Sequence, residues 1–242
     1  MEDVSIQGMD RFEKGLKDLN IHLSKEQLQQ FLRYYELLVE WNKVMNLTAI
    51  TEFEDVVTKH FLDSLSLIKV TVPNNERLLD MGTGAGFPGI PLKIAFPSLK
   101  VVLIDSLKKR IYFLEEVIKA LGLSDIYALH GRAEEYGREK DYRESFDLCV
   151  SRAVARLSVL SEYCLPYVKT GGYFIPYKSG FIQEELQEAV KAVHLLGAEI
   201  ERKEEFLLPG TEIDRTLIRI HKTKSTPLKY PRSAGKPSKE PL

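Results

Sequence analysis

The sequence predicts an α/β protein in which a mostly parallel sheet carries helices on both faces, preceded by a small helical region. Two observations carry this prediction. From residue 77 onward, short apolar runs alternate with helical stretches, and a glycine-rich turn separates the first run from the helix that follows it. Such alternation is typical of βαβ units, whose strands lie parallel in one sheet. The turn is typical of a sheet that binds a nucleotide at its edge.

The composition is that of an ordinary globular protein. The 242 residues suffice for one large domain with a small extension, and 44% of them are hydrophobic. The 34 basic and 35 acidic residues nearly cancel, which argues against a histone-like binder of nucleic acid but allows a local basic face. The 2 cysteines exclude a disulfide framework and a four-cysteine zinc site, and we expect no metal site.

Targeting signals are missing from the sequence. No apolar run approaches the roughly 20 residues that span a bilayer. The N-terminal stretch also lacks the basic region and apolar core of a signal peptide. We therefore expect a cytoplasmic monomer that makes no contact with a membrane.

Residues 1–72 are predicted to form the helical N-terminal region. Ser24 and Gln27 have the spacing of a capping box, and apolar residues recur behind them at helical spacing. A second helix is expected over 53–68, and Pro73 ends the helical pattern.

Residues 73–223 are predicted to form the sheet domain. Apolar runs predict strands at 78–80, 101–105, 126–129, 146–150, 173–175 and 217–220. Helices are expected between them at 90–96, 108–121, 156–168 and 183–196. Residues 224–242 are basic and rich in proline, so we expect either a loosely ordered segment or an extended arm, outside the glycine crevice.

The glycine-rich turn is the sharpest motif of the chain. It reads Asp80-Met81-Gly82-Thr83-Gly84-Ala85-Gly86-Phe87-Pro88-Gly89 and leads from a strand into a helix. Glycines allow a tight turn and a close approach of the backbone to a ligand. The spacing from Gly84 to Gly89 also matches a dinucleotide fingerprint, which by itself is weak evidence.

Two carboxylates indicate which ligand the turn holds. Asp80 ends the strand before Gly82, where it would repel a pyrophosphate but suit the sulfonium and ammonium groups of S-adenosylmethionine. Asp105 ends the next strand, where it can accept both ribose hydroxyls of either ligand. S-adenosylmethionine is therefore favoured, a dinucleotide is the alternative, and a purely structural glycine turn is the third possibility.

Two further strand ends meet the same edge of the predicted sheet. Ala133 and Glu134 follow the third strand, where backbone amides and an acid could bracket an adenine. Arg152 follows the fourth strand and should lie over the ligand crevice, which makes it the candidate catalytic residue. The alternatives are a structural ion pair of Arg152 with Glu134 or Asp105, and a role for Glu134 as a helix N-terminal charge.

Motifs of two methylase classes are missing from the chain. Amino-group methylases of nucleic acids usually carry an Asn/Asp-Pro-Pro-aromatic run after the fourth strand, where this chain has Ser151-Arg152-Ala153-Val154. Carbon-5 pyrimidine methylases need a nucleophilic cysteine, but Cys149 lies inside a strand and Cys164 inside an apolar helix. Methylation of a guanine N7 needs neither the Asn/Asp-Pro-Pro-aromatic run nor the cysteine, because N7 offers a lone pair and carries no proton. Alignment of the reactants and electrostatic stabilisation then suffice for catalysis.

Basic residues cluster in two places that could bind RNA phosphates. Lys108, Lys109 and Arg110 begin a helix at the cofactor edge. The arm contributes a second cluster, from which we select Lys229, Arg232 and Lys236. The alternative for the arm is a solvated tail that only promotes solubility.

The chain resembles the RsmG (GidB, glucose-inhibited division protein B) family. The glycine-proline run from Asp80 to Leu92 carries the resemblance most specifically. Supporting blocks are Trp41-Asn42, Asn46-Leu47-Thr48, Lys59-His60, Asp63-Ser64, Asp105-Ser106, Lys109-Arg110, Arg132-Ala133-Glu134, Ser151-Arg152-Ala153 and Tyr230-Pro231-Arg232. The resemblance implies a class I, Rossmann-like methyltransferase that methylates N7 of one guanine in the 530 loop of 16S ribosomal RNA. The RNA would be presented within the small ribosomal subunit or an assembly intermediate.

The resemblance also implies a set of cofactor contacts. Carried over by position, these are Gly82, Phe87, Ala133, Glu134 and Arg152. The residues themselves add Asp80, Gly84 and Asp105, with Ser106 and Leu107 expected on the ribose side. An NAD-type oxidoreductase or a non-catalytic nucleotide sensor remains the alternative function.

Overall fold

The computed structural model describes residues 2–152, 155–180 and 182–242, with side chains from Gln7 onward. The N-terminal region consists of α1 (Glu2–Asp18), α2 (Lys25–Met45) and one almost continuous helical segment. That segment runs through α3 (Phe53–Val56), the π-helical η1 (Val57–Leu62), α4 (Asp63–Leu65) and the 3-10 helix η2 (Ser66–Lys69). The expected helix over 53–68 is therefore confirmed.

The capping box at the start of α2 is also confirmed. The Ser24 side chain accepts a hydrogen bond from the backbone of Gln27, whose side chain accepts one from the Ser24 backbone. The helix buries Phe31, Tyr34, Leu37 and Leu38.

A single seven-stranded sheet forms the centre of the molecule, in the order β3-β2-β1-β4-β5-β7-β6. Its strands are β1 (Arg77–Met81), β2 (Lys100–Asp105), β3 (Ile126–His130), β4 (Phe146–Arg152), β5 (Val168–Ser179), β6 (Ala198–Leu207) and β7 (Asp214–Lys222). The pairs among β1 to β5 are parallel, and β7 runs antiparallel to both β5 and β6. The mostly parallel sheet expected from the sequence is confirmed.

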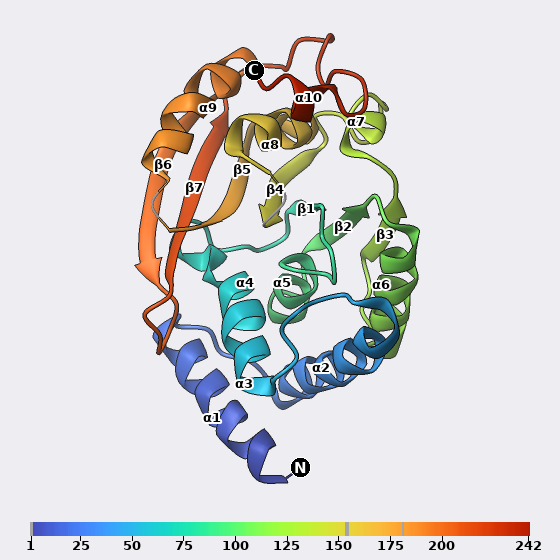
Figure 1. Ribbon diagram of the computed structural model, residues 1–242, viewed down its shortest axis with the longest axis vertical. Coiled ribbons are helices and arrows are strands. Elements are labelled where there is room, and N and C mark those ends of the chain that lie inside the picture. Colours follow the sequence, from blue (N-terminus) through green and yellow to red (C-terminus); the bar gives the residue numbers. More distant parts are fainter. Residues whose placement is uncertain (1, 153–154, 181) are drawn as a thin grey trace.

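Helices cover both faces of the sheet, as expected. They are α5 (Gly89–Ala95), α6 (Lys108–Ala120), α7 (Ala133–Tyr136), α8 (Leu157–Cys164) with the 3-10 helix η3 (Leu165–Tyr167), and α9 (Gln183–Leu195). Figure 1 shows α8 and α9 on one side of the sheet and α1, α2, α5 and α6 on the other. Alternate strand residues serve the two faces: Leu78 packs into the core with α1 and α2, and Leu79 into the core with α8 and α9.

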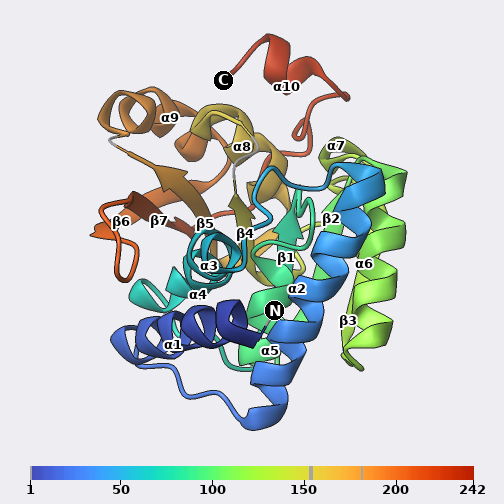
Figure 2. The ribbon, with the colours of Figure 1, turned by 60° about the horizontal axis from the view of Figure 1, so that its bottom comes forward.

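The N-terminal region shares the first of these cores. Phe61 and Tyr34 pack against Phe87 of the glycine-rich turn, and Phe31 packs against Phe61. Figure 2 shows α1 and α2 crossing beside α5. The Tyr34 hydroxyl also donates a hydrogen bond to the Ala85 carbonyl oxygen. Residues 1–72 therefore hold the back of the turn in place.

The C-terminal segment differs from expectation, because it is packed rather than loosely ordered. Tyr230 is 6% exposed and joins the core beneath α8. The backbone carbonyl groups of this segment lie outside helices and strands, and arginine side chains donate hydrogen bonds to them. Arg143 donates to the carbonyl oxygens of Thr226 and Tyr230, and Arg138 donates to that of Pro231. The segment ends in a short helix, α10 (Lys236–Lys239), which lies against α8 (Figure 1).

Candidate active site

The glycine-rich turn leaves the carboxyl end of β1 and is tied to the end of β2. The amides of Gly82 and Thr83 both donate to the Ile104 carbonyl oxygen. Gly82, Gly84 and Gly86 have φ angles of 70°, 62° and 98°, a left-handed region that side chains disfavour. The glycines are therefore required by the backbone path of the turn.

Asp80 closes the turn from below. It is fully buried, and its Oδ2 accepts hydrogen bonds from Thr83 Oγ1 at 2.6 Å and from the Gly89 amide at 2.8 Å. Burial raises the pKa of this carboxyl to about 6, although both hydrogen bonds oppose the rise. The other oxygen, Oδ1, has no hydrogen-bond partner among the described residues. Asp80 thus organises the turn and keeps one acceptor unused.

Asp105 fastens the turn from the side. Its carboxylate accepts from the amides of Gly84 and Leu107, each at 2.9 Å, and from Arg110 Nη1 at 3.0 Å. The residue is only 3% exposed. The ion pair with Arg110 was not expected from the sequence, which assigned that arginine to an RNA surface.

A cavity of about 170 Å³ opens where β1, β2 and β3 end. Its lining includes five residues predicted from the sequence: Gly82, Asp105, Ser106, Ala133 and Glu134. It also includes five that sequence reasoning did not select: Met81, Ile104, Gly131, Arg132 and Tyr163. Met81, Ile104 and Arg132 adjoin predicted residues in the chain and Gly131 precedes Arg132, whereas Tyr163 comes from α8 and carries no motif that would reveal it.

The remaining predicted cofactor residues lie around this cavity without lining it. Asp80 and Gly84 belong to the turn, and Leu107 follows Ser106 at the start of α6 with 44% of its surface exposed. Phe87 is 5% exposed and packs away from the cavity against α2 and η1.

Glu134 makes a contact that contradicts one expectation about the C-terminal segment. The side chain is 5% exposed, and its Oε1 accepts a hydrogen bond of 2.8 Å from the Gly235 amide. The arm was expected to lie outside the glycine crevice, yet here it touches a residue that lines the cavity. The sequence could not reveal this, because the donor is a backbone amide far along the chain.

Arg152 ends β4 and joins it to the N-terminal region. Its guanidinium donates to Asp63 Oδ2 at 2.8 Å and to the Lys59 carbonyl oxygen at 3.0 Å, and it lies 5.1 Å above the Phe87 ring. Its ion-pair partner is thus Asp63, and not Glu134 or Asp105 as the structural alternative supposed. Ala153 and Val154, which follow it in the predicted Ser151–Val154 run, lie outside the described residues.

Asp63 and His60 complete this cluster. Asp63 is 2% exposed and also accepts from Arg215 Nε at 2.9 Å. The His60 ring stacks on Phe87 with centroids 4.4 Å apart, and Arg152 approaches its Nδ1 at 3.1 Å. Burial and the Arg152 charge lower the pKa of His60 to about 3. The ring is therefore neutral, with Nδ1 also 3.1 Å from the Lys59 carbonyl oxygen and Nε2 3.0 Å from Thr48 Oγ1.

Both cysteines are buried packing residues, as the sequence predicted. Cys149 lies in β4 and Cys164 in α8, each fully buried. Burial raises the pKa of Cys149 well above its usual value, which opposes formation of a thiolate. Neither residue lines the cavity.

The predicted RNA-binding residues fall into two groups. Lys108 lies over the exposed Tyr112 ring and Lys109 donates to the Met45 carbonyl oxygen, while Lys229 and Lys236 are both exposed. Arg110 and Arg232 differ, because Asp105 and the buried Glu162 engage their guanidinium groups. Their charges are neutralised within the protein.

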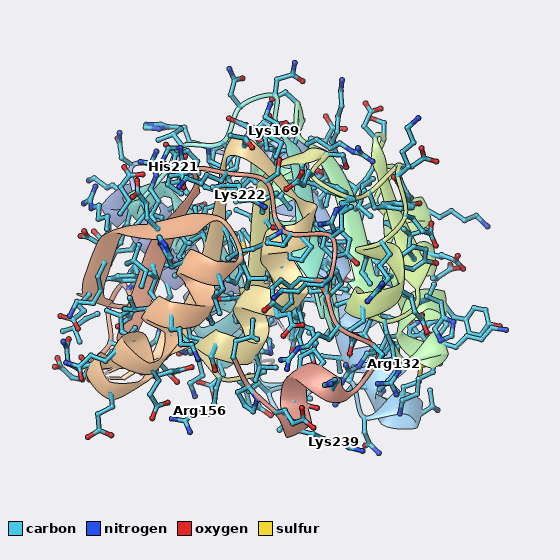
Figure 3. All side chains as sticks on the ribbon, turned by 90° about the horizontal axis from the view of Figure 1, so that it is seen from above. Arg132, Arg156, Lys169, His221, Lys222 and Lys239 are labelled. Atoms are coloured by element: carbon cyan, nitrogen blue, oxygen red, sulfur yellow. The ribbon has the colours of Figure 1, made fainter. Side chains whose placement is uncertain are left out.

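The basic side chains labelled in Figure 3 lie toward the two ends of the strands. Seen from above in Figure 3, Arg132, Arg156 and Lys239 lie on the side of α10, and Lys169 and His221 lie opposite. The first group belongs to the edge where the parallel strands end. Within the described ranges there is no cluster of three or more side chains suited to a metal ion, and no helix long and apolar enough to cross a membrane.

Comparison with known proteins places the chain in a family. Residues 27–213 match the model of the GidB family, described as rRNA small subunit methyltransferase G. The chain is 62% identical over 232 residues to the ribosomal RNA small subunit methyltransferase G of Lachnoclostridium phytofermentans, covering 96% of each protein. It is 49% identical over 243 residues to that of Desulforamulus reducens, covering 100% of each.

Solved structures support the fold. A SAM-dependent methyltransferase from Aquifex aeolicus superposes with a TM-score of 0.52 at 18% identity, over 68% of this chain and 92% of that one. TYW2 of P. horikoshii in complex with MeSAdo gives 0.53 at 17% identity, over 68% and 63%. The class I, Rossmann-like fold is thereby confirmed, and the family supports S-adenosylmethionine as the cofactor. The chain belongs to the GidB family of rRNA small subunit methyltransferases G.

Proposed function

We propose that this protein transfers a methyl group from S-adenosylmethionine to N7 of a guanine in the 530 loop of 16S ribosomal RNA. The observation that carries the proposal is the cavity beside the tied glycine turn, in a chain of an rRNA methyltransferase family. Tied loops, a carboxylate and backbone amides at the carboxyl ends of parallel strands are what a nucleoside cofactor requires.

The residues around the cavity fit the parts of that cofactor. Asp105 and Ser106 would hold the ribose, and Ala133 with Glu134 the adenine, because these residues line the cavity at the ends of β2 and β3. Gly82, which lines the cavity at the end of β1, would border the amino acid part, with the Asp80 carboxyl buried behind the turn. S-adenosylmethionine supplies an activated methyl group when bound, which leaves the protein to align the acceptor.

The acceptor atom is inferred from two groups that methylation of N7 does not need, a general base and a nucleophilic cysteine. The guanine N7 lone pair would form the new bond to the methyl carbon while the carbon–sulfur bond breaks and its electron pair stays on sulfur. No proton has to leave, so a base is not needed, and both cysteines are buried away from the cavity. The product base carries a positive charge.

Arg152 is proposed to position the acceptor base. It stands at the end of β4, next in the sheet to β1, and its side chain is 14% exposed. The Asp63 carboxylate offsets its charge, which matters because the methylated guanine becomes cationic. His60 is also neutral, so it adds no positive charge that would repel the cationic product base.

The RNA surface is proposed to lie along the carboxyl edge of the sheet. Lys108 and Lys109 flank the cavity on α6, and Lys229 and Lys236 belong to the C-terminal segment. Substrate would be 16S RNA in the small subunit or in an assembly intermediate.

Two experiments test the proposal. Incubation of the protein with small subunits and isotope-labelled S-adenosylmethionine, followed by mass mapping of the RNA, should locate one methyl group on a guanine of the 530 loop. S-adenosylhomocysteine should raise the melting temperature and NAD should not. Stabilisation by NAD alone would favour the oxidoreductase alternative.

A further inference from the structure

The C-terminal strap, defined as residues 226–240, lies across the helices that border the cofactor cavity. Two anchors hold it. Tyr230 is buried beneath α8, and the Arg232 guanidinium makes a two-pronged contact with Glu162, its Nε and Nη2 lying 2.9 and 2.6 Å from the two carboxylate oxygens. The Arg232 amide donates to the same carboxylate at 2.7 Å. Glu162 is 1% exposed, so this ion pair is shielded from water.

Beyond the anchors, the strap reaches two residues of the cavity wall. The Gly235 amide donates to Glu134 Oε1 at 2.8 Å. Tyr163, the next residue after Glu162, also lines the cavity. Burial and the Glu134 carboxylate raise the pKa of Tyr163, and Ser238 of α10 opposes that rise. Glu134, Tyr163 and the strap are therefore in direct proximity.

The hydrogen bond from the Gly235 amide constrains the Glu134 side chain, which lines the cavity. Among the described residues, Gly235 is the one partner that makes a hydrogen bond or ion pair with the Glu134 side chain. A carboxylate held by one charge-assisted hydrogen bond keeps its orientation only while that donor stays in place. The position of Gly235 is in turn set by the Arg232 anchor, three residues earlier.

We propose that the C-terminal strap is part of the cofactor site, with Gly235 a positioning residue whose amide orients Glu134 toward the adenine side of the cavity. This rests on the proposed function, which places S-adenosylmethionine in that cavity. The strap thereby joins a basic, RNA-facing segment to cofactor binding.

The test is a pair of matched substitutions in the full-length chain. Gly235→Pro removes the amide donor and forces a negative φ on the backbone, and Gly210→Pro makes the same two changes in the β6–β7 turn. Both glycines have left-handed φ angles, 78° and 70°, and open space around the position of a Cβ. Titration with S-adenosylhomocysteine should show about tenfold weaker binding for Gly235→Pro, equivalent to about 1.4 kcal/mol. Gly210→Pro should bind as the wild type does.

Kinetics separate positioning from a general loss of structure. In Gly235→Pro the KM for S-adenosylmethionine should rise about tenfold while kcat, measured with both the RNA and the cofactor at saturation, stays within about twofold, because Arg152, which is proposed to position the acceptor base, is not changed. Should Gly235→Pro fail to fold, Arg232→Lys provides a second variant, which keeps the charge beside Glu162 but loses the fork geometry. It should weaken S-adenosylhomocysteine binding about threefold.

Glu134→Ala distinguishes failure of this inference from failure of the proposed function. Weak S-adenosylhomocysteine binding in Glu134→Ala, together with wild-type binding in Gly235→Pro, would overturn the role of the strap alone. Wild-type binding in both Glu134→Ala and Gly82→Val would show that the cofactor binds elsewhere, and the strap inference would fall with the proposed site.

Discussion

At the scale of single residues, Asp80 carries the most unusual chemistry of the site. A buried carboxyl with one unused oxygen is costly to ionise, and its pKa of about 6 in the folded protein exceeds the unfolded value of 3.8. A group with a raised pKa contributes stability below its unfolded pKa and loses it as the pH rises through the folded pKa.

Asp80→Asn should remove this pH dependence. The amide oxygen can still accept from Thr83 and Gly89, and no charge forms. The free energy of unfolding of Asp80→Asn relative to wild type should therefore increase by about 2 kcal/mol between pH 4.5 and pH 7. Urea denaturation at the two pH values measures it. A difference that does not change with pH would contradict the raised pKa.

Arg152 should act on the acceptor rather than on the cofactor. Arg152→Ala leaves Asp63 paired with Arg215, so the fold should persist. S-adenosylhomocysteine affinity should stay within about threefold of wild type, and kcat should fall tenfold or more because the base is misplaced. Arg156→Ala removes an exposed arginine at the same edge and serves as the control. A loss of cofactor affinity that matches the loss of kcat would refute the acceptor role.

The cysteines test the N7 chemistry. Cys149→Ser and Cys164→Ser should keep substantial activity, since no thiolate attacks the base. Each buries a hydroxyl, which costs about 1–3 kcal/mol of stability. Chemical denaturation and turnover assays give the two quantities. A folded serine variant that binds S-adenosylhomocysteine but has no activity would argue for covalent catalysis.

At the scale of elements, local patterns predicted most of the helices and strands, and the misses have physical causes. The capping box at Ser24 and the apolar strands of the sheet centre depend on neighbours in sequence. β6 carries charges at most positions because it is an edge strand exposed to solvent, so it shows no apolar run. The strap was expected to be loose because its order comes from distant partners, chiefly Glu162 and Arg143.

The ion pair between Arg232 and Glu162 should therefore contribute most of the stability of the strap. Arg232→Ala leaves the buried Glu162 carboxylate with the backbone amide of residue 232 but without its counter-charge, and should cost about 3–5 kcal/mol in unfolding free energy. The double variant Glu162→Leu/Arg232→Met removes both charges and should recover most of that loss. Thermal and urea denaturation compare the two. Equal losses in the single and double variants would mean that the ion pair itself is not what holds the strap.

At the scale of the whole molecule, a net charge of −1 leaves RNA binding to local surfaces. Neutralising Lys229 and Lys236 should flatten the salt dependence of RNA affinity by about 1.4–1.8 units of slope, since each phosphate contact contributes roughly 0.7–0.9. Arg232 is not included, because Glu162 already holds it. An unchanged slope would locate the RNA surface elsewhere, with Lys108 and Lys109 the next candidates.

Some residues of the candidate site could be predicted from their neighbours in sequence, and others could not, because only the fold brings them to the site. The glycine turn, Asp105 and Glu134 stand at strand ends and could be predicted from sequence, and they meet at one cavity. Tyr163 and the Gly235 amide reach it from α8 and the strap, where only the fold brings them near. The pairing of Arg152 with Asp63 likewise depends on how the N-terminal helices pack against β4.

The most direct test of the central claim is the position of the transferred methyl group. Small subunits lacking this modification should be incubated with the protein and isotope-labelled S-adenosylmethionine, and the 16S RNA then digested and mapped by mass spectrometry. The account predicts one labelled methyl group on N7 of a guanine in the 530 loop. A label on another atom, on another RNA segment, or on no RNA at all would contradict it.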